Sequence, residues 1–505
     1  MSYFSKSSIN YTNYYEFYQS VIEKYPDRFF EDIDNGIKVN SLEFHQLVQK
    51  TILLIKSEIK DTGKRIGVCI ENSLLNVIVY YSVILSENIY IPLSNKMTHI
   101  ELKNIISSSN INLVLSETKH LSLFEDLVNN LINLDDFILF NNLKTEEIDK
   151  IDNKSKFDDE IEIFFTSGTT GSPKGIVHTQ KSRILSAIAV GNALGFNYGY
   201  NLLSFLPLTH TASWTYIISP GFYSGSNIFY CKKFSKSQFW EIIKKYEINY
   251  VQVVPTILSM LLNPPENVPD EKKRSLKCIG CGSAPLPMDT LKRFEETFHI
   301  PIINLYGLSE TGPTHYISPT DEKRYKGSLG LPIDINKVKI VNKMSKECKP
   351  FESGEILIKG PNLMKGYFFK DGLDRENIKD GWFYTGDIGY LDEDGHLYLL
   401  DRKKDVIIKG GINIYPSEID DLLFGYPDIV EVCTVGVKDD IYGENVVSYV
   451  VARNNNLYEK DIIDFCRKHM EGFKCPKKII FIDRIPKGPT GKFSRRELAN
   501  LYLER

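Results

Sequence analysis

Residues 165 to 175 read FTSGTTGSPKG, and their types suit the binding of phosphate oxygens. Glycines let the backbone approach a ligand closely, while clustered N–H groups, hydroxyls and a lysine donate to anionic oxygens. The residues that would make these contacts are Thr166, Ser167, Gly168, Thr169, Thr170, Gly171 and Lys174. The segment therefore predicts a phosphate-binding loop.

This loop is not an ordinary P-loop. The pattern G-x-x-x-x-G-K-[ST] is not met, because Lys174 follows Pro173 and precedes Gly175. A cluster of Gly, Ser and Thr alone would indicate a flexible connection. Here an apolar, strand-like run precedes the loop and a helix-like run follows it, which favours an ordered ligand-binding segment.

The segment closely resembles the signature of the adenylate-forming (AMP-binding) superfamily, which includes acyl- and aryl-CoA synthetases. Further motifs match the family in order and spacing over about residues 165 to 495, whereas the first 160 residues fit only in length and general pattern. The resemblance implies that a small carboxylic acid reacts with ATP and Mg²⁺ to give acyl-AMP and pyrophosphate. In most members the acyl group is then transferred to a thiol.

Such a reaction is first an electrostatic problem, because two anions must meet and the transition state gathers negative charge. Lys492 lies in PKGPTGKFSRREL, which resembles the family's C-terminal lysine motif. The resemblance implies that Lys492 bridges the carboxylate and the α-phosphate oxygens. Taken alone, Lys492 would be read as a solvated surface charge.

The run NLYGLSETG, residues 304 to 312, resembles the family's YGxTE element. Ser309 replaces the usual threonine, which keeps the hydroxyl and loses a methyl group. By this resemblance Glu310 is the carboxylate that binds Mg²⁺, an ion that prefers oxygen ligands. Thr311 would be a secondary polar contact, and Tyr306 would offer a face on which adenine stacks.

Further motifs are expected around the nucleoside. Asp387 in WFYTGDIG resembles the family's TGD aspartate, which accepts hydrogen bonds from both ribose hydroxyls. Arg402 in DRKKD would contact the ribose and a phosphate, and Lys404 falls at the family's hinge position. Ser283, Ala284 and Pro285 match the adenine-side loop, and Gly282 matches the wall between the nucleotide and acid pockets.

The acid is expected against FLPLTHTASW, residues 205 to 214. The resemblance places His210 beside the carboxylate and makes Trp214 a candidate gate, with simple core packing as the alternative. No aspartate here could pair a substrate ammonium, which disfavours amino acids. Gly307 and Gly282 leave room where acetate-specific relatives place bulk, so aryl acids and medium or long fatty acids both remain.

The thiol would approach from the C-terminal part of the chain. The residues that match that face of the family are Gly410, Gly411, Tyr415, Tyr442, Phe473, Lys474 and Lys477. Because GFKCPKK resembles the CoA-nucleotide contact of some ligases, CoA is favoured as the acceptor. The phosphopantetheine of a holo carrier protein is the alternative. A catalytically silent nucleotide-binding protein is a second alternative, which Lys174, Glu310, Asp387 and Lys492 together disfavour.

Composition excludes other classes of function. The chain has 505 residues, with 61 Lys plus Arg against 65 Asp plus Glu and a net charge of −4, so nucleic acid is a poor first guess for a partner. Eight scattered cysteines and an N-terminus without a signal-peptide pattern predict a reduced, cytoplasmic protein. The most apolar run, residues 74 to 93, is interrupted by polar residues and predicts a buried helix and then a strand rather than a membrane span.

The elements that must position these residues follow an alternating pattern. Runs rich in β-branched residues, such as those at 65–70 and 250–255, alternate with helix-like stretches such as 42–59 and 181–194, which predicts a mixed α/β and α+β fold. Near the C-terminus the pattern changes to short strands and turns. We expect a large N-terminal domain of sheet and helix subdomains, residues 1–403, and a small mobile α+β domain, residues 404–505, with the hinge near Lys404.

Two further features are assigned no chemistry. Cys278 and Cys281 form a C-x-x-C, but no second pair of cysteines or spaced histidines completes a zinc site, which favours buried thiols. The histidines His45, His178 and His396 are isolated in sequence, and no role is assigned to them.

Overall fold

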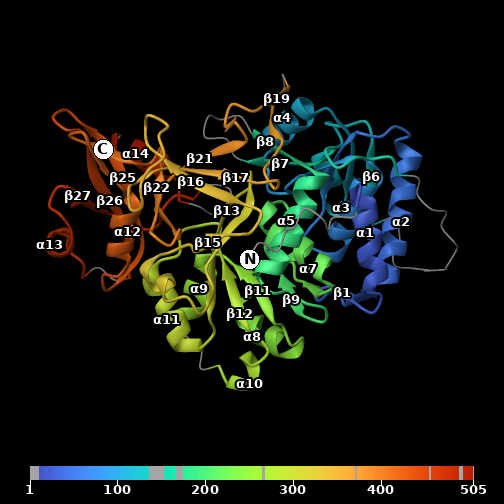
Figure 1. Cartoon of the computed structure of the whole chain (residues 1–505), viewed down its shortest axis with the longest axis horizontal. Helices are drawn as coiled ribbons and strands as arrows, with labels where there is room; N and C mark the ends of the chain where they lie inside the picture. The colour runs from blue at the N-terminus through green and yellow to red at the C-terminus, as the bar shows by residue number, and fades with distance from the viewer. Residues whose placement is uncertain are drawn as a thin grey trace.

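The computed structural model describes residues 11–135, 153–166, 174–263, 268–369, 372–453, 456–487 and 493–503. Within these ranges the chain forms four β-sheets with helices packed against them (Figure 1). The prediction of a mixed α/β and α+β fold is confirmed.

The first sheet has nine strands, and its central strands are parallel. In spatial order they are β15 (Leu331–Pro332), β14 (Gly312–Tyr316), β13 (Ile302–Leu308), β12 (Cys278–Cys281), β11 (Tyr250–Val253), β9 (Asn201–Ser204), β10 (Asn227–Tyr230), β1 (Phe29–Asp32) and β2 (Ile37–Asn40). On its outer side lie α8 (Lys236–Lys245), α9 (Pro255–Leu262), α10 (Asp270–Lys273) and α11 (Met288–Phe298). Trp240, Leu258 and Phe294 of these helices share a buried cluster with Val251 and Ile279 of the sheet.

The second sheet has eight strands, of which β3 to β7 are parallel to one another. Their order is β19 (Gly372–Asp374), β18 (Gly366–Phe369), β8 (Lys174–Thr179), β7 (Glu160–Thr166), β4 (Ile89–Pro92), β3 (Arg65–Cys69), β5 (Ile111–Ser116) and β6 (Leu131–Asn133). Helix α4 (His99–Ser109) packs on this sheet through Leu102 and Ile105, which share a cluster with Ile91 and Val114.

One large core joins the two sheets. Its helices are α1 (Tyr14–Lys24), α2 (Ser41–Glu58), α3 (Leu74–Leu85), α5 (Gln180–Ala193) and α7 (Ser219–Ser224), the last preceded by α6 (Thr211–Ser213) and a π-helical turn (Trp214–Ile218). Tyr18, Tyr81 and Phe222 of these helices lie in one cluster with Phe30 of the first sheet and Tyr90 of the second. Both sheets bury side chains in this one close-packed cluster. The loops at the ends of the two sheets are therefore held at fixed positions relative to one another.

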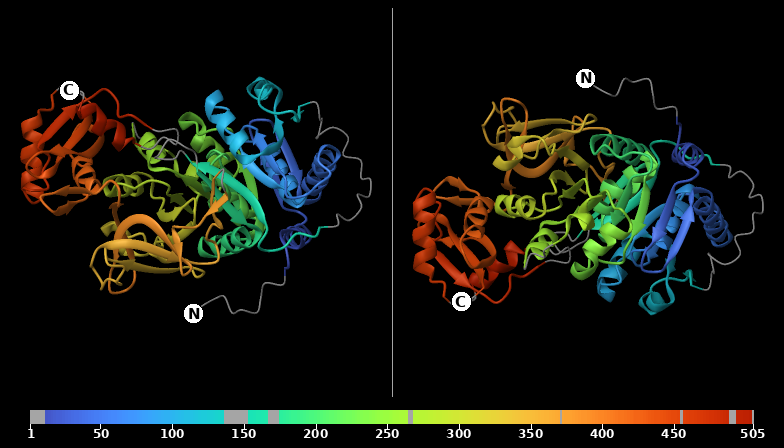
Figure 2. Two further views of the ribbon diagram at one scale, coloured as in Figure 1. Left: turned by 90° about the horizontal axis from the view of Figure 1, so that it is seen from above. Right: turned by 90° about the horizontal axis from the view of Figure 1, so that it is seen from below.

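The remaining sheets are formed by the last part of the chain. The third contains β16 (Lys337–Val341), β17 (Gly354–Lys359), β21 (Trp382–Leu391), β20 (Ile378–Lys379) and β22 (Leu397–Arg402). The fourth contains β24 (Ile412–Ile414), β23 (Ile407–Lys409), β26 (Gly443–Ala452), β25 (Ile429–Asp439) and β27 (Lys478–Phe481), with α12 (Pro416–Phe424), α13 (Glu459–His469) and α14 (Arg495–Leu503) beside it. The fourth sheet and its helices, coloured red, lie at one end of the molecule, and the orange third sheet lies beside them (Figure 2).

Lys404 lies in the turn of residues 403–405, which connects β22 of the third sheet to β23 of the fourth. Its side chain is exposed. The run at 74–93 forms α3 and then β4, as its interrupted pattern predicts, and no helix within the described residues is both long and apolar enough to cross a bilayer.

Candidate functional site

A tight turn between β13 and β14 presents Ser309, Glu310 and Thr311. A Cβ added to Gly307 would lie 2.2 Å from the carbonyl oxygen of Gly312, and Gly312 itself has a φ of +63°. Both positions therefore require glycine, the first for close backbone approach and the second for its left-handed conformation. The YGLSETG sequence builds this turn, which places a hydroxyl and a carboxylate side by side.

The segment around β18 holds the turn in place. The side-chain amide of Asn362 donates to the carbonyl of Thr311 at 2.6 Å, and the backbone N–H of Met364 donates to that of Glu310 at 2.7 Å. The hydroxyl of Tyr367 donates to Oε1 of Glu310 at 2.8 Å. The Glu310 carboxylate is thus half-buried and oriented before any ligand binds.

His178 supports the same turn from β8, although sequence analysis assigned it no role. Its Nε2 donates to the carbonyl of Ser309 at 2.8 Å, and the side chain is fully buried. Burial, with a smaller effect of the nearby Arg183 charge, lowers the pKa of His178 well below its ordinary value, so the ring is neutral. Thr211 also contacts Ser309, with 3.2 Å between the two hydroxyl oxygens. His178 follows Lys174 by four residues on the strand that leaves the glycine-rich loop, which is the one signal that could have indicated it.

Asp387 sits at the centre of a buried polar group. It pairs with Arg402 across the β21–β22 ladder, with 2.8 Å between Arg402 Nε and Asp387 Oδ1, and Tyr306 donates its hydroxyl to Oδ2 at 2.7 Å. Only 2% of Asp387 is exposed. Burial and the Asp387 charge raise the pKa of Tyr306. Burial lowers the pKa of Arg402, but the combined attraction of Asp387 and its other acidic neighbours raises it on balance. Tyr306 therefore orients Asp387, and the stacking of adenine on its ring stays a prediction.

The predicted adenine-side loop follows β12. Ser283 has a positive φ of 68°, while Ala284 is half-buried and Pro285 is exposed. A Cβ added to Gly282 would lie 2.9 Å from the carbonyl oxygen of Leu305, so this loop runs against the strand that holds Tyr306. Close backbone approach explains Gly282, as it does Gly307. The sequence interpretation that these glycines leave room for a larger acid stays a prediction.

The predicted acid-side segment lies between β9 and α7. His210 is exposed and precedes the first residue of α6. Trp214 is 1% exposed, its ring centroid is 3.8 Å from that of Tyr80, and its indole N–H donates to the carbonyl of Leu208 at 2.9 Å. A gate at Trp214 would have to leave this stack, so the structure favours core packing.

Several predicted residues fall outside the described ranges, namely Ser167, Gly168, Thr169, Thr170, Gly171 and Lys492. The strands on either side of the glycine-rich loop are described, and Thr166 of β7 pairs with Lys174 of β8. The Lys174 ammonium lies 5.4 Å from the centre of the Tyr367 ring, the same tyrosine that binds Glu310. The end of the glycine-rich loop thus lies near the Ser309–Thr311 turn.

Comparison with known proteins agrees with this arrangement. The family model for AMP-binding enzymes matches residues 19–368, and the model for the C-terminal domain of AMP-binding enzymes matches residues 418–492. The chain belongs to the AMP-binding enzyme family. Members of this family, the adenylate-forming superfamily, are the proteins whose motifs the sequence resembles.

Named relatives extend this result. The chain is 35% identical to 2-succinylbenzoate–CoA ligase of Bacillus licheniformis over 68% of this chain and 70% of that protein. It is 29% identical to oxalate–CoA ligase of Arabidopsis thaliana over 96% of this chain and 98% of the relative. The structure of O-succinylbenzoate CoA synthetase from Bacillus subtilis with ATP and magnesium ion superposes with a TM-score of 0.85 at 28% identity, covering 95% of this chain and 98% of that one.

This AMP-binding enzyme is therefore an ATP-dependent, AMP-forming acid–thiol ligase that uses Mg²⁺ and CoA. The silent nucleotide-binding alternative is wrong. The prediction of an acyl-CoA synthetase type of enzyme is confirmed, whereas the acid and the roles of individual residues stay predictions.

Two residues predicted for the thiol side of this AMP-binding enzyme, Tyr442 and Lys477, line a shallow depression. Gly410 and Gly411 both have positive φ and form the β23–β24 turn, and the N–H of Gly410 donates to the carbonyl of Tyr442 at 2.8 Å. Lys409 donates to the carbonyl of Phe473 at 3.2 Å. Tyr442, Lys409, Arg467, Gly472 and Lys477 line the depression.

The two predicted lysines near the depression differ in their contacts. Lys477 pairs with Asp439 at 3.1 Å and lies on the rim. Lys474 pairs instead with Glu418 of α12 at 2.9 Å and with Glu471 at 3.3 Å. Lys474 has two carboxylate partners and does not line the depression, whereas Lys477 has one and lines it, so Lys477 is the better placed of the two for a phosphate.

The buried histidines predict how stability depends on pH. Burial lowers the pKa of His315 to about 3 and that of His178 well below its ordinary value, whereas both titrate near 6.5 in the unfolded chain. Below that pH the unfolded state binds more protons, so stability falls as the pH is lowered, by about 1.4 kcal/mol per histidine at pH 5.5. Calorimetry at pH 7.5 and 5.5 measures the loss. His315→Gln should lessen the loss of stability between these pH values, whereas His99→Gln, at an exposed site, should not change it. If the His315→Gln variant lost as much stability as the unsubstituted protein, the explanation would be contradicted.

Proposed function

We propose that this enzyme activates a carboxylic acid that bears a second polar group and transfers it to CoA. The observation that supports the adenylation step most directly is the buried Asp387, held by Tyr306 and Arg402 beside the Ser309–Thr311 turn. This arrangement offers a fixed anion to ribose hydroxyls and a fixed guanidinium to the phosphates.

The first half-reaction joins the acid to ATP. A carboxylate oxygen attacks the α-phosphorus, the bond to the pyrophosphate oxygen breaks, and acyl-AMP and pyrophosphate result. Lys492 is proposed to neutralise the charge that gathers on the oxygens between them, with His210 on the acid side. The Thr166–Gly171 loop, Lys174, Ser309 and Thr311 bind phosphate oxygens, and Ser283, Ala284 and Pro285 border the adenine.

Glu310 is proposed to hold Mg²⁺. Its half-buried carboxylate is oriented by Tyr367 and lies next to the hydroxyl of Ser309, so the donors are oxygens, as this ion prefers. The residues therefore fit the ion. When bound, Mg²⁺ neutralises charge on the phosphate oxygens.

In the second half-reaction the thiolate sulfur attacks the acyl carbon, and the bond to AMP breaks. We propose that the domain of residues 404–505 rotates at Lys404 to bring the depression at Gly410, Tyr442 and Lys477 to the acyl group. CoA is favoured over a holo carrier protein because the named relatives are CoA ligases and because Lys409, Arg467 and Lys477 offer cations to a phosphate. Eight free cysteines suit the reducing cytoplasm as the compartment.

The acid is proposed to be an aryl acid with a second carboxylate or similar polar group, in preference to a fatty acid. Both 2-succinylbenzoate and oxalate, the acids in the relatives' names, carry two carboxylates. In this chain the hydroxyl of Ser186 is buried and has no hydrogen-bond partner within the described residues. It lies beside Gly312, whose added Cβ would be 3.2 Å from it and 3.8 Å from a methyl group of Thr215.

A panel of acids tests this proposal. Pyrophosphate release is measured with 2-succinylbenzoate, oxalate, benzoate, cinnamate and octanoate, and each active acid is then offered CoA and holo carrier protein. We expect 2-succinylbenzoate to exceed benzoate and octanoate, and CoA to be the better acceptor. Ser186→Ala should lower kcat/KM for the preferred acid about three- to tenfold, the value of one hydrogen bond, without affecting benzoate. A preference for octanoate would reject the polar acid, and faster loading of the carrier protein would reject CoA.

A further inference from the structure

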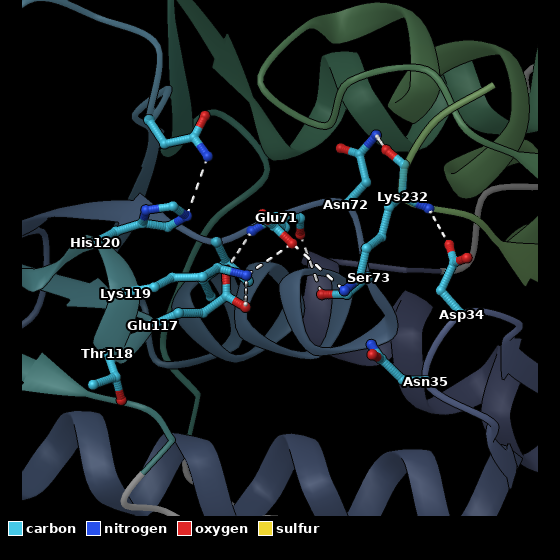
Figure 3. Close-up of polar contacts among 12 residues, drawn as sticks. Asp34, Asn35, Glu71, Asn72, Ser73, Glu117, Thr118, Lys119, His120 and Lys232 are labelled. Carbon is cyan, nitrogen blue, oxygen red and sulfur yellow. Dashed lines mark hydrogen bonds and ion pairs between the residues drawn. The ribbon is translucent and has the colours of Figure 1, made fainter. Parts of the chain in front are cut away.

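Asn72 joins the two large sheets at the loop that leads to the acid side of the site. It lies between β3 of the second sheet and α3, and its side chain points toward the segment containing Lys232, which follows β10 of the first sheet (Figure 3). Neither a catalytic nor a nucleotide-binding motif includes it. Its contacts, however, lie on the chain just before His210.

The side-chain amide of Asn72 forms hydrogen bonds with four backbone groups. Nδ2 donates to the carbonyls of Phe205 at 3.2 Å, Leu206 at 3.1 Å and Lys232 at 3.1 Å, and Oδ1 accepts from the N–H of Leu208 at 2.8 Å. An asparagine side chain has two N–H donors and a carbonyl acceptor, so one N–H is shared between two of the three carbonyls while Oδ1 accepts from Leu208. In an Asn72→Asp variant, a carboxylate oxygen would replace Nδ2 and face the three carbonyl oxygens, which are also acceptors, so these hydrogen bonds would be lost.

The loop that Asn72 holds ends at His210. On its other side the hydroxyl of Ser213 donates to the carbonyl of Leu206 at 2.7 Å, and Trp214 donates to that of Leu208. Asn72 thus holds the loop from the connection between β3 and α3, while Ser213 and Trp214 hold it from the helical segment that follows His210. The next residue after His210 is Thr211, whose hydroxyl contacts that of Ser309. A shift of the loop would therefore also shift a residue that contacts the proposed site.

The neighbours of Asn72 hold it firmly in place. The N–H of Glu71 donates to Glu117 at 2.8 Å, and Lys119 pairs with both carboxylates, at 2.8 Å from Glu71 and 3.2 Å from Glu117. Figure 3 shows these side chains grouped beside Asn72 at the carboxyl ends of β3 and β5. Glu71 follows β3 and Glu117 follows β5, so both carboxylates are attached to strands of the second sheet. The backbone that carries Asn72 is therefore held rigidly.

We propose that Asn72 is a positioning residue for adenylation, which fixes the loop of residues 205–210 and through it sets His210 against the acid. The inference rests on the proposed role of His210. Loss of the amide would free the loop without removing any group that touches a substrate. A displacement of about 1 Å at a reacting group can cost as much as about 100-fold in rate.

The test compares Asn72→Ala with Asn76→Ala. Asn76 is the control, because its side chain likewise bonds to the backbone, donating to the carbonyl of Ile70 at 2.9 Å, and accepts from Tyr90 at 3.0 Å without contacting the loop. It is buried, whereas Asn72 is half-buried. We expect Asn72→Ala to lower kcat for ATP–pyrophosphate exchange about 10- to 100-fold with the KM for ATP within about twofold. Asn76→Ala should lower the melting temperature similarly but keep kcat within about twofold. Asn72→Asp, which keeps the shape and the acceptor, should lose at least as much activity as the alanine variant.

A double-mutant cycle with His210→Ala distinguishes positioning from general stabilisation. If Asn72 acts through His210, then Asn72→Ala should cost less than about threefold in kcat when His210 is already alanine. Additive losses, a near-normal Asn72→Asp enzyme, or an equal loss in Asn76→Ala would overturn the inference and leave the proposed function intact. Full activity of His210→Ala alone would overturn the proposed role of His210, and the positioning inference with it.

Discussion

Replacing Lys492 with alanine is expected to abolish most acyl-AMP formation while the transfer of preformed acyl-AMP to CoA continues. The physical reason is that the first half-reaction brings two anions together, and a fixed cation between them stabilises charge that develops only in the transition state. Removing one such donor costs about 100- to 1,000-fold in kcat. ATP–pyrophosphate exchange measures the first half-reaction, and CoA thioester formation from synthetic acyl-AMP measures the second.

Lys487 provides the matched control for this experiment. It lies five residues before Lys492 in the same motif, and its ammonium pairs with Glu431 at 2.6 Å. Lys487→Ala removes the same charge from the same segment, yet it should keep exchange within about threefold, since loss of an exposed ion pair costs little. Near-normal exchange in Lys492→Ala would reject the assignment, and loss of both half-reactions would indicate a folding defect instead.

Much of the fold follows from local patterns in the sequence. The runs at 65–70 and 250–255 predict strands, and the structure has β3 at Arg65–Cys69 and β11 at Tyr250–Val253. The helix-like stretch at 42–59 corresponds to α2 at Ser41–Glu58, where Asn40 and Glu43 form a capping box. These elements are predictable because their signals, periodicity and capping, lie within the element itself.

The contacts that assemble the site are not predictable in this way. His178 meets Ser309 and Asn72 meets Leu208 across 131 and 136 residues of sequence. No local pattern predicts a contact between residues so far apart in the sequence. For this reason sequence analysis assigns no role to His178 and does not identify Asn72. The glycines show a related limit. From sequence, Gly282 and Gly307 are interpreted as leaving room for the acid. The structure adds a requirement of the backbone, because both glycines pack against carbonyl groups, those of Leu305 and Gly312.

Asp387→Asn is expected to weaken ATP use more than any other isosteric change among the described site residues. The substitution keeps the shape of the side chain but removes the charge that pairs with Arg402, at 2.8 Å, and turns one acceptor into a donor facing Tyr306. It also removes the anion proposed to accept both ribose hydroxyls. Charge-assisted hydrogen bonds contribute about 1.5 to 3 kcal/mol each, so loss of two lowers kcat/KM for ATP by about 100-fold or more.

Asp392→Asn separates this effect from a loss of stability. Asp392 follows the same strand, is similarly buried at 7% exposure and pairs with Lys323 at 2.8 Å, but it belongs to a group with His396 rather than to the site. Both substitutions should lower the melting temperature, because each removes the charge of a buried carboxylate that takes part in an ion pair. Only Asp387→Asn should raise the KM for ATP, with a smaller effect on the KM for the acid. Equal KM values for ATP in the two variants would mean that Asp387 supports the sheet and not the ribose, since a purely structural carboxylate has no reason to discriminate between the two substrates.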